Sequence, residues 1–228
     1  MKLEDLKIKI FADCATRMEM IRLAQLPYIK GFTTNPTLMR KGGVSEYEKW
    51  AKNVLAAIPD KPISFEVIAD NFDEMERQAR KIAAWGENVY VKIPVMNTKG
   101  QSSAYTIHRL TLDGIKVNVT AVMNRVPDDI FVALQPRVSS IISYFVGRVT
   151  DTGALYEIFD DFRAPQKLWA STREVLNIFQ ADRAHYDIIT VPPEILAKLA
   201  LIGKDLDEYS LETVKQFYDD AVAAGYTL

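Results

Sequence analysis

A lysine stands inside an otherwise apolar stretch of this chain. Lys92 lies in Val-Tyr-Val-Lys-Ile-Pro at residues 89–94, a run with the composition of a buried strand. A lysine within a strand is most often a surface residue whose amine reaches water or an ion pair. A lysine that is removed from water instead has its pKa lowered, so that a neutral amine becomes available near pH 7. Such an amine can attack a ketone, and the resulting imine accepts electrons when a carbon–carbon bond breaks.

Cleavage through an imine also requires a group that takes up and returns a proton. Asp13 and Glu66 are the candidate carboxylates, because each lies near the end of a predicted strand. Other predicted strands also end in polar residues, namely Asn35, Asn118, Thr120, Ser143 and Ser171. Polar groups that meet in a protein interior are costly unless they are paired, so their convergence indicates a functional site.

Two arginines indicate that the ligand is an anion. Arg148 follows the sixth predicted strand, and Arg173 follows the seventh. A guanidinium offers its donors in a fork that fits phosphate oxygens, and barrels often bind phosphate near their last strands. The alternative is that both arginines lie in surface loops without a ligand.

Competing chemistries lack the residues that they need. The chain has two histidines: His108 lies in helical sequence, and His185 precedes the eighth predicted strand, at the end of the barrel away from the site. A metal-dependent aldolase and a Ser–His–Asp hydrolase are therefore disfavoured, and no glycine-rich nucleotide loop is present. Cys14 should point away from Asp13 and serve packing. We expect no metal and no cofactor.

The elements that would position these residues alternate along the chain. Short β-branched runs predict strands at 8–13, 31–35, 63–68, 89–93, 116–121, 141–146, 167–171 and 187–191. Amphipathic segments between them predict helices, the later ones at 154–162, 173–181 and 193–201. This alternation predicts a single (β/α)8 barrel, the TIM-barrel fold, over residues 1–228. An open, doubly wound sheet is the alternative, because pattern alone does not establish closure.

Bulk composition limits the class of protein. The 228 residues fit one domain, and 48% hydrophobic with 25% charged residues allows a large core under a solvated surface. A net charge of −2 offers no basic footprint for nucleic acid or an anionic membrane. The start of the chain lacks the apolar run of a secretory signal, and a single cysteine suits a reducing compartment. These features predict a cytoplasmic protein.

An amphipathic segment closes the sequence. We predict an extra helix at about 210–224, with Ser210 as its N-cap and Gly225 at its end. Its apolar face is expected to pack on its own barrel, as terminal helices usually do; the alternative is that it reaches a neighbouring subunit.

The motifs, taken together, resemble the transaldolase family, especially its short members and their fructose-6-phosphate aldolase relatives. The matching blocks occur in family order at 11–13, 31–38, 64–67, 91–94, 118–120, 142–148, 170–173 and 190–193. The resemblance implies transfer of a dihydroxyacetone unit from a ketose phosphate, such as sedoheptulose 7-phosphate or fructose 6-phosphate, to an aldose phosphate. It also implies a role in carbohydrate metabolism such as the pentose phosphate pathway.

The resemblance also implies roles for single residues. Lys92 matches the Schiff-base lysine, Asp13 matches the acid/base carboxylate, and Glu66 with Thr120 matches the pair that holds a catalytic water. Asn35 and Asn118 match residues that hold substrate hydroxyls, with Ser143 and Phe145 in the same pocket. The implied phosphate-binding set is Arg148, Ser171 and Arg173.

Two positions distinguish transaldolases from the aldolase relatives. The aldolases typically carry Gln where this chain has Glu66 and Tyr where it has Phe145, so both markers favour a transferase. The chain departs from the family at Tyr144, at Met123-Asn124-Arg125, and at Thr172 and Glu174, which flank the mouth. An unusual sugar phosphate and aldolase-type release of dihydroxyacetone therefore stay open as alternatives.

Other classes of function are also compatible with a barrel. One is a non-catalytic sugar-phosphate-binding barrel, which loss of Lys92, Asp13 or Glu66 would have favoured; all three are present. Another is a phosphosugar isomerase or decarboxylase, which gives no reason for the ordered blocks. Small family members often form rings of five paired into decamers, so a homo-oligomer, pentameric or decameric, is expected.

Overall fold

A computed structural model describes residues 3–150 and 165–227 of the chain. Eight parallel strands form a closed barrel in chain order, and β8 returns to pair with β1, for example Ile189 with Ile10. The predicted barrel is therefore confirmed, and the open sheet is wrong. The strands are β1 (Lys9–Asp13), β2 (Ile29–Thr33), β3 (Ile63–Glu66), β4 (Val89–Pro94), β5 (Val117–Val122), β6 (Ile141–Tyr144), β7 (Lys167–Trp169) and β8 (Ile188–Val191).

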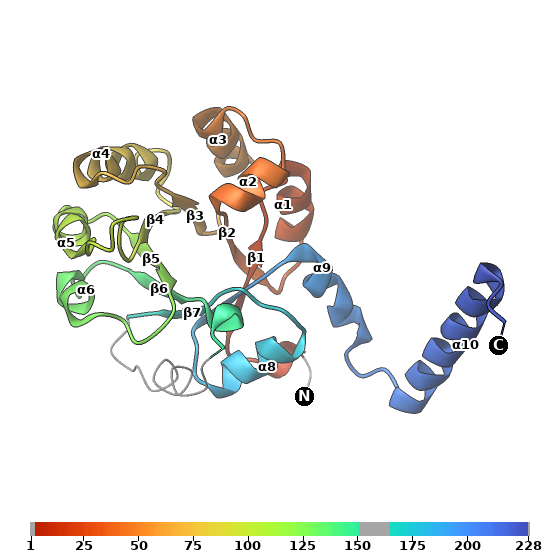
Figure 1. The fold of residues 1–228 in the computed structure, drawn as a ribbon. Coiled ribbons are helices and arrows are strands. Elements are labelled where there is room, and N and C mark those ends of the chain that lie inside the picture. The colour runs from red at the N-terminus through yellow and green to blue at the C-terminus, as the bar shows by residue number, and fades with distance from the viewer. Residues whose placement is uncertain (1–2, 151–164, 228) are drawn as a thin grey trace.

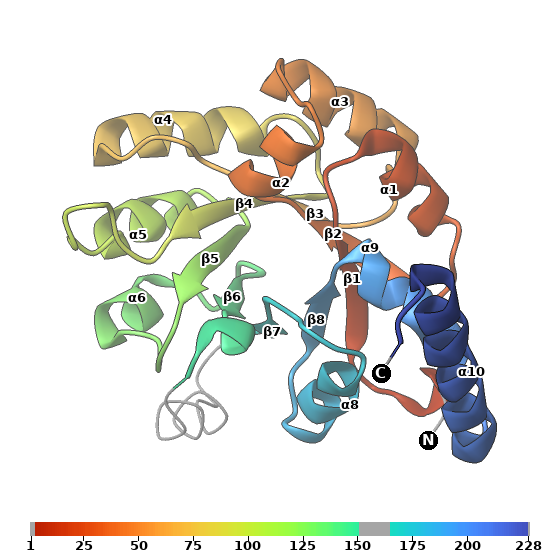
Figure 2. The same ribbon diagram turned by 45° about the vertical axis from the view of Figure 1, so that its right-hand side comes forward.

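Helices surround the barrel, as Figures 1 and 2 show. They are α1 (Arg17–Ala24), α2 (Pro36–Lys41), α3 (Tyr47–Ala57), α4 (Phe72–Ala83), α5 (Ala104–Leu112), α6 (Asp128–Ala133), α8 (Leu176–Arg183), α9 (Pro193–Leu196) and α10 (Leu206–Ala224). The helix predicted at 154–162 lies outside the described residues. No helix in the described parts of the chain is both long and apolar enough to cross a membrane.

The second strand differs from its prediction by two residues at each end. β2 begins at Ile29 and ends at Thr33, so Asn35 lies beyond it and caps α2. The Asn35 side-chain oxygen accepts a hydrogen bond from the backbone N–H of Leu38 at 2.9 Å. This bond satisfies one of the N–H groups that a helix leaves unpaired at its start.

Alternation along the strands separates two apolar clusters. Residues such as Ala12, Phe32 and Val91 belong to the main core, which includes the buried faces of the helices. Their neighbours in sequence point to the interior of the barrel and form a second cluster of Phe11, Ile141, Leu168, Ala170 and Ile188. Since successive strand residues face opposite sides, each strand can fill the outer core and still supply the barrel interior.

Gly31 makes room for the largest side chain of the inner cluster. A Cβ atom at Gly31 would lie 2.6 Å from the Phe11 ring, which β1 places opposite it. Phe11 is two residues before Asp13 on the same strand, so its ring lies on the inner face, below the carboxylate. The glycine therefore lets an aromatic ring occupy the barrel interior beneath the residues at the mouth.

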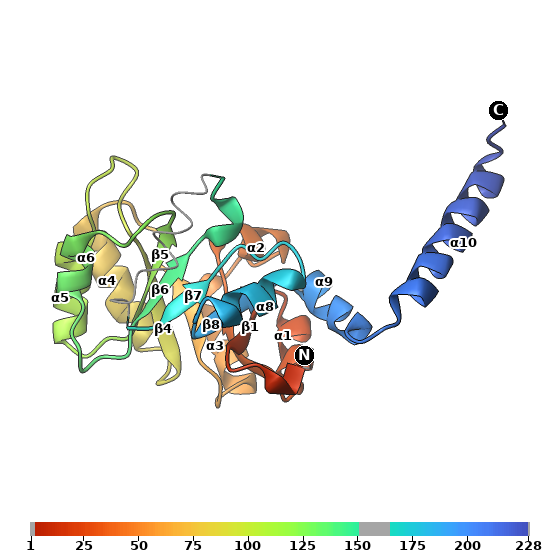
Figure 3. The same cartoon turned by 90° about the horizontal axis from the view of Figure 1, so that it is seen from below.

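The last helix does not follow its prediction. α10 starts at Leu206, and Asp205, rather than Ser210, is the N-cap, accepting hydrogen bonds from the backbone N–H groups of Asp207 and Glu208. Gly225 ends the helix, as predicted, and has the left-handed conformation. The expectation that this helix packs on its own barrel is wrong: none of its described residues is buried, and Figures 1 and 3 show it extending away from the barrel.

Candidate active site

The predicted catalytic residues share the inner face of neighbouring strands. Strand pairing places Glu66 of β3 beside Lys92 of β4, and Lys92 beside Asn118 of β5. On the other side of the barrel, Asp13 of β1 pairs with Thr33 of β2. Asp13, Thr33 and Glu66 end their strands and Lys92 lies in the second half of β4, so these side chains gather toward the mouth of the barrel, with Asn118 near the start of β5.

Lys92 is held by two oxygen atoms. Its side chain is only 6% exposed, and its Nζ lies 3.0 Å from Glu66 Oε2. Nζ also donates a hydrogen bond to the Thr34 carbonyl oxygen at 2.8 Å. Because a buried charge is costly without partners, these two contacts explain how the amine can stay inside the barrel. They also place a carboxylate where it can exchange a proton with the amine.

Glu66 is positioned by contacts to its own backbone. The Tyr47 hydroxyl on α3 donates a hydrogen bond to the Glu66 carbonyl oxygen at 3.0 Å, and burial raises the pKa of Tyr47. Tyr47 also belongs to an aromatic group with Trp50, Phe65 and Trp85, so its ring is fixed by packing. The strand end that carries Glu66 is therefore tied to α3.

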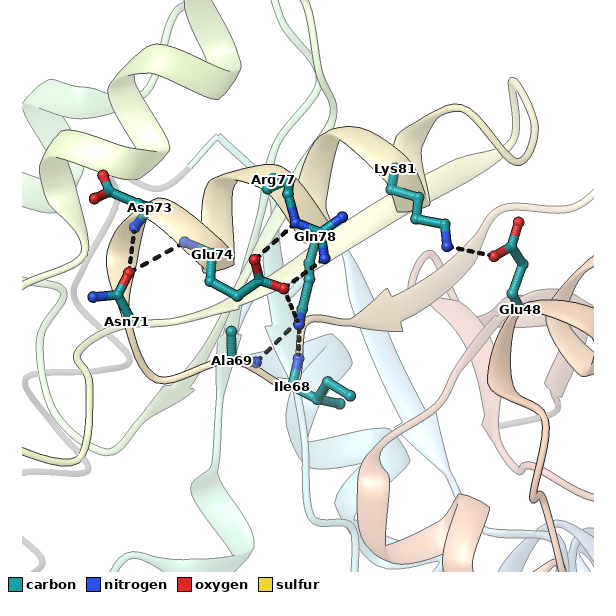
Figure 4. A network of polar contacts seen from close by, with 9 residues as sticks. All are labelled: Glu48, Ile68, Ala69, Asn71, Asp73, Glu74, Arg77, Gln78 and Lys81. Atoms are coloured by element: carbon teal, nitrogen blue, oxygen red, sulfur yellow. Dashed lines mark hydrogen bonds and ion pairs between the residues drawn. The ribbon is translucent and has the colours of Figure 1, made fainter.

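The loop after Glu66 is fixed from α4, as Figure 4 shows. The Gln78 side-chain oxygen accepts hydrogen bonds from the backbone N–H groups of Ile68 and Ala69 at 2.9 and 3.0 Å. Asn71 caps α4, and Glu74 bonds both Gln78 and Arg77. With two of its backbone N–H groups bonded in this way, the loop that follows the carboxylate is anchored to α4.

Asp13 is surrounded by groups that act on the pKa of its carboxyl in opposite directions. Burial raises the pKa of the Asp13 carboxyl above its ordinary value, and this effect exceeds the lowering by the Lys92 charge and by the hydrogen bond from Thr33. The Thr33 hydroxyl donates to Asp13 Oδ1 at 2.8 Å. A buried carboxyl with a raised pKa that also senses the charge of a lysine is suited to accept a proton and to return it.

Hydroxyl and amide groups form a second chain across the strands. The Ser143 hydroxyl of β6 donates to Asn118 Oδ1 at 2.6 Å, and Asn118 Nδ2 donates to the Ser64 hydroxyl of β3 at 3.1 Å. These three side chains are buried. Thr120 is different, because its buried hydroxyl has no hydrogen-bond partner among the described residues. A polar atom of this kind is available to a water molecule or a ligand.

The two arginines occupy neighbouring loops. Arg173 Nε donates a hydrogen bond to the Gly147 carbonyl oxygen at 3.2 Å, and the Arg148 guanidinium lies 5.0 Å from the centre of the Phe145 ring. A Cβ atom at Gly147 would lie 1.7 Å from the Ser171 carbonyl oxygen, so the loops approach too closely for any side chain there. Ser171 itself has the left-handed φ of 62°, unusual for a residue other than glycine.

The structure thus brings some of the predicted residues into direct contact and leaves others apart. Asn118 bonds Ser143, Glu66 pairs with Lys92, and the Lys92 charge acts on Asp13. The arginines, exposed in their loops, make no described contact with these residues. His108 lies in α5 and His185 lies in the loop shortly before β8, as predicted, and Cys14 is buried in the outer core.

The sequence interpretation missed four contributors, namely Thr33, Thr34, Ser64 and Thr190. Three of them supply hydroxyls to the inner face, while Thr34 supplies its carbonyl oxygen to Lys92. Ser64 lies two residues before Glu66, so strict alternation could have placed it on the same face. No side-chain pattern could have identified the Thr34 carbonyl.

Comparison with known proteins places this geometry in a family. Residues 10–228 match the family model described as transaldolase/fructose-6-phosphate aldolase. The probable transaldolase of Hyphomonas neptunium is 33% identical over 227 residues, covering 96% of this chain and 99% of the relative. The probable transaldolase of Thermoplasma volcanium is 34% identical over 212 residues, covering 88% and 91%. That of Dehalococcoides mccartyi is 32% identical over 201 residues, covering 84% and 90%.

Solved structures with low sequence identity share the fold. A crystal structure of 2,3-dimethylmalate lyase superposes with a TM-score of 0.58 at 10% identity, covering 98% of this chain and 86% of that one. A structure described as KGPDC from Streptococcus mutans gives 0.59, also at 10% identity, covering 82% and 89%. At such identities the likeness shows only the shared barrel architecture.

Proposed function

The chain belongs to the transaldolase/fructose-6-phosphate aldolase family, and we propose that it is a transaldolase that works through a Schiff base on Lys92. It would move a dihydroxyacetone unit from a ketose phosphate to an aldose phosphate. The observation that carries the proposal is the buried Lys92 amine, 3.0 Å from Glu66 Oε2 and within the electrostatic reach of Asp13.

Imine formation is the first step of the proposed reaction. The Lys92 amine gives up a proton and attacks the C2 carbonyl carbon of the ketose, and the carbinolamine then loses water. Glu66 is the nearest carboxylate to Nζ and can accept the proton from the amine. The unpartnered Thr120 hydroxyl offers a place to hold the water that leaves and later returns for hydrolysis.

Carbon–carbon cleavage is the second step. Asp13 takes the proton of the C4 hydroxyl, the C3–C4 electron pair moves toward the iminium nitrogen, and C4 leaves as the aldehyde of an aldose phosphate. The raised pKa of Asp13 supports this role, because the carboxyl must hold a proton in one half of the cycle and release it in the other. The enamine then attacks the acceptor aldehyde, and Asp13 returns the proton to the new hydroxyl. Water finally hydrolyses the imine and frees Lys92.

Substrate recognition would be divided between the barrel interior and the arginine loops. The Asn118 and Ser143 side chains can bond hydroxyls of the dihydroxyacetone unit, and Asn35 lies just beyond β2. Arg148 and Arg173 lie in adjoining loops, after β6 and β7, and suit the phosphate of either sugar, with Ser171 in the second of these loops. The phosphate would thus hold both sugars in the same register relative to Lys92.

The second candidate is an aldolase that releases free dihydroxyacetone. The family resemblance assigns Gln and Tyr to the aldolases where this chain has Glu66 and Phe145, and the Glu66 contact with Nζ supports the transferase assignment. The departures at Met123 and Thr172 affect the rim, so an unusual acceptor sugar is compatible with the same chemistry.

A two-substrate assay tests the proposal. We expect purified protein with fructose 6-phosphate to release glyceraldehyde 3-phosphate only when erythrose 4-phosphate is added as acceptor. Borohydride with the ketose phosphate should add one sugar unit to the peptide containing Lys92, as measured by mass spectrometry. Acceptor-independent release with accumulating dihydroxyacetone would identify the aldolase instead, and an absence of any trapped ketose would count against Schiff-base chemistry.

We also propose that α10 packs on a neighbouring copy of the chain in a homo-oligomer. Leu211, Val214, Phe217 and Val222 are each more than half exposed on this helix, which is a large apolar surface for a helix in water. Sedimentation of the full chain is expected to give a pentamer or decamer, whereas a chain ending at residue 204 should sediment as a smaller species. An unchanged mass after truncation would show that other surfaces hold the oligomer together.

A further inference from the structure

We propose that Thr190 is a positioning residue that orients the Asp13 carboxylate through the hydroxyl of Thr33. Its catalytic consequence rests on the proposed function, in which Asp13 moves the proton during bond cleavage. The hydroxyl chain itself is a property of the fold and can be tested without substrate.

Three neighbouring strands build the chain of hydroxyls. β1 lies between β2 and β8, and it places Asp13 beside Thr33, with Thr190 of β8 beside Phe11 one inward position below. The Thr33 hydroxyl contacts both Asp13 Oδ1, at 2.8 Å, and the Thr190 hydroxyl. Thr33 and Thr190 are buried, with 2% and 4% of their surfaces exposed.

The direction of the hydrogen bonds follows from the number of protons. A threonine hydroxyl has one hydrogen, and that of Thr33 is donated to the carboxylate, which can only accept. Thr33 can therefore bond Thr190 only as an acceptor, and Thr190 must be the donor. A hydroxyl that accepts a hydrogen bond becomes a better donor, so Thr190 strengthens the bond that Thr33 makes to Asp13.

The chain of threonine hydroxyls makes the two oxygen atoms of the Asp13 carboxylate different. Oδ1 is occupied by Thr33, whereas Oδ2 has no hydrogen-bond partner among the described residues. Oδ2 is therefore the atom that faces the substrate hydroxyl. The charged groups that act on Asp13 are Lys92 of β4, Glu66 of β3 and Glu194 of α9. Since Lys92 is bonded to Glu66 and Thr34, the threonine chain is what fixes the rotation of the carboxylate.

Thr190 is itself held from the arginine loop. The buried Thr172 hydroxyl donates a hydrogen bond to the Thr190 carbonyl oxygen at 2.7 Å. Thr172 lies between Ser171 and Arg173 and is one of the positions at which this chain departs from the family pattern. This bond holds the backbone at the end of β8 in place, so the Thr190 side chain is positioned to bond Thr33.

Titration of Asp13 in the protein without substrate tests the chain of hydroxyls directly. We would label aspartate carboxyl carbons with ¹³C, follow the NMR signals against pH, and identify Asp13 by its loss in Asp13→Asn. Thr190→Val keeps the shape but removes the donor, so the charged carboxylate is less well stabilised. In Thr190→Val, the titration midpoint of the Asp13 carboxyl is expected to rise by roughly 0.3 to 1 pH unit. In Thr190→Ser, it should return to the wild-type value.

Activity supplies the second readout. For Thr190→Val, we expect kcat for ketose-phosphate cleavage to fall roughly threefold to tenfold. The acidic limb of the pH profile of kcat should move to higher pH. The rate of borohydride trapping on Lys92 should stay unchanged, because imine formation does not use Asp13. Thr111→Val is the matched control: it removes a buried hydroxyl bond on α5, to the Ile107 carbonyl, and should leave the Asp13 midpoint unaltered.

The outcomes separate the two proposals. If the titration midpoint of Asp13 does not move in Thr190→Val, the positioning role is overturned. It is also overturned if the midpoint moves as far in Thr190→Ser as in Thr190→Val, because the loss of methyl packing would then be responsible. If the wild-type protein traps no ketose phosphate, the proposed function fails, yet the titration still decides whether Thr190 acts on Asp13.

Discussion

Replacing Lys92 by methionine is expected to abolish turnover, with kcat lowered on the order of 10⁴-fold or more, because no other amine can take over the covalent step. Methionine preserves the length of the side chain but cannot form an imine. The loss is measured as acceptor-dependent release of aldose phosphate, and borohydride trapping should disappear in parallel. Lys116→Met, at a half-buried lysine directly before β5, at the end of the strand away from the mouth, is the matched control and should retain both signals.

The same substitution leaves Glu66 without its partner, and the resulting instability has to be separated from the loss of chemistry. Removing one member of a largely buried ion pair costs a few kcal/mol, because the remaining charge is left uncompensated. The double variant Lys92→Met, Glu66→Gln removes both charges and should unfold at a higher temperature than Lys92→Met alone. Both variants should be inactive. Turnover by a folded Lys92→Met protein would rule out the Schiff-base mechanism.

The Asp13→Asn variant is expected to separate imine formation from bond cleavage. Asparagine cannot accept the C4 hydroxyl proton, so kcat should fall about 10²- to 10⁴-fold, the usual contribution of a general base. Lys92 and Glu66 remain in place, so the donor should still form its imine and borohydride should trap at least as much sugar as in the wild type. Single-turnover trapping and steady-state release measure the two steps. Asp70→Asn, an exposed carboxylate bonded to Thr98, serves as control.

Asp13→Asn also has a predicted effect on stability. The folded pKa of Asp13 is raised, so the native state holds this proton more tightly than the unfolded chain does. Raising the pH above the ordinary carboxyl pKa therefore lowers the free energy of unfolding through this group, and that loss is absent below the ordinary pKa. The variant should melt at a higher temperature than the wild type at pH 7, with the difference shrinking toward pH 4. If Asp13→Asn is less stable at pH 7, the direction assigned to this pKa is wrong.

The barrel and most of its mouth were predictable because strand alternation is a strong constraint. A lysine, two carboxylates and an asparagine at inward positions of apolar strands have few other interpretations, and the barrel topology converts their positions in sequence into neighbours in space. The second strand was misplaced because Lys30 is exposed and interrupts the apolar pattern at its start. Threonine and serine are common in strands, so Thr33, Ser64 and Thr190 did not stand out as polar contributors.

The terminal helix shows where local pattern stops being informative. Asp205 and Ser210 are both good N-cap residues, and the choice between them depends on five residues of ordinary helical sequence. An apolar stripe predicts that a helix face is covered, but it does not specify by which surface. The two arginines were predicted only from their positions after the sixth and seventh strands. The close approach of their loops depends on Gly147, and the sequence does not reveal that the Ser171 carbonyl lies beside this glycine.

Phe11 closes the interior of the barrel below Asp13, because Gly31 leaves space for its ring and four aliphatic side chains pack around it. Among the described residues, this inner cluster leaves the predicted catalytic groups open to one end of the barrel. In the proposed reaction, two sugars that need the same amine would use that entrance in turn, and the first aldose would leave before the second arrives. The closed lower end of the barrel would therefore favour a ping-pong order, the same order that the proposed covalent intermediate requires.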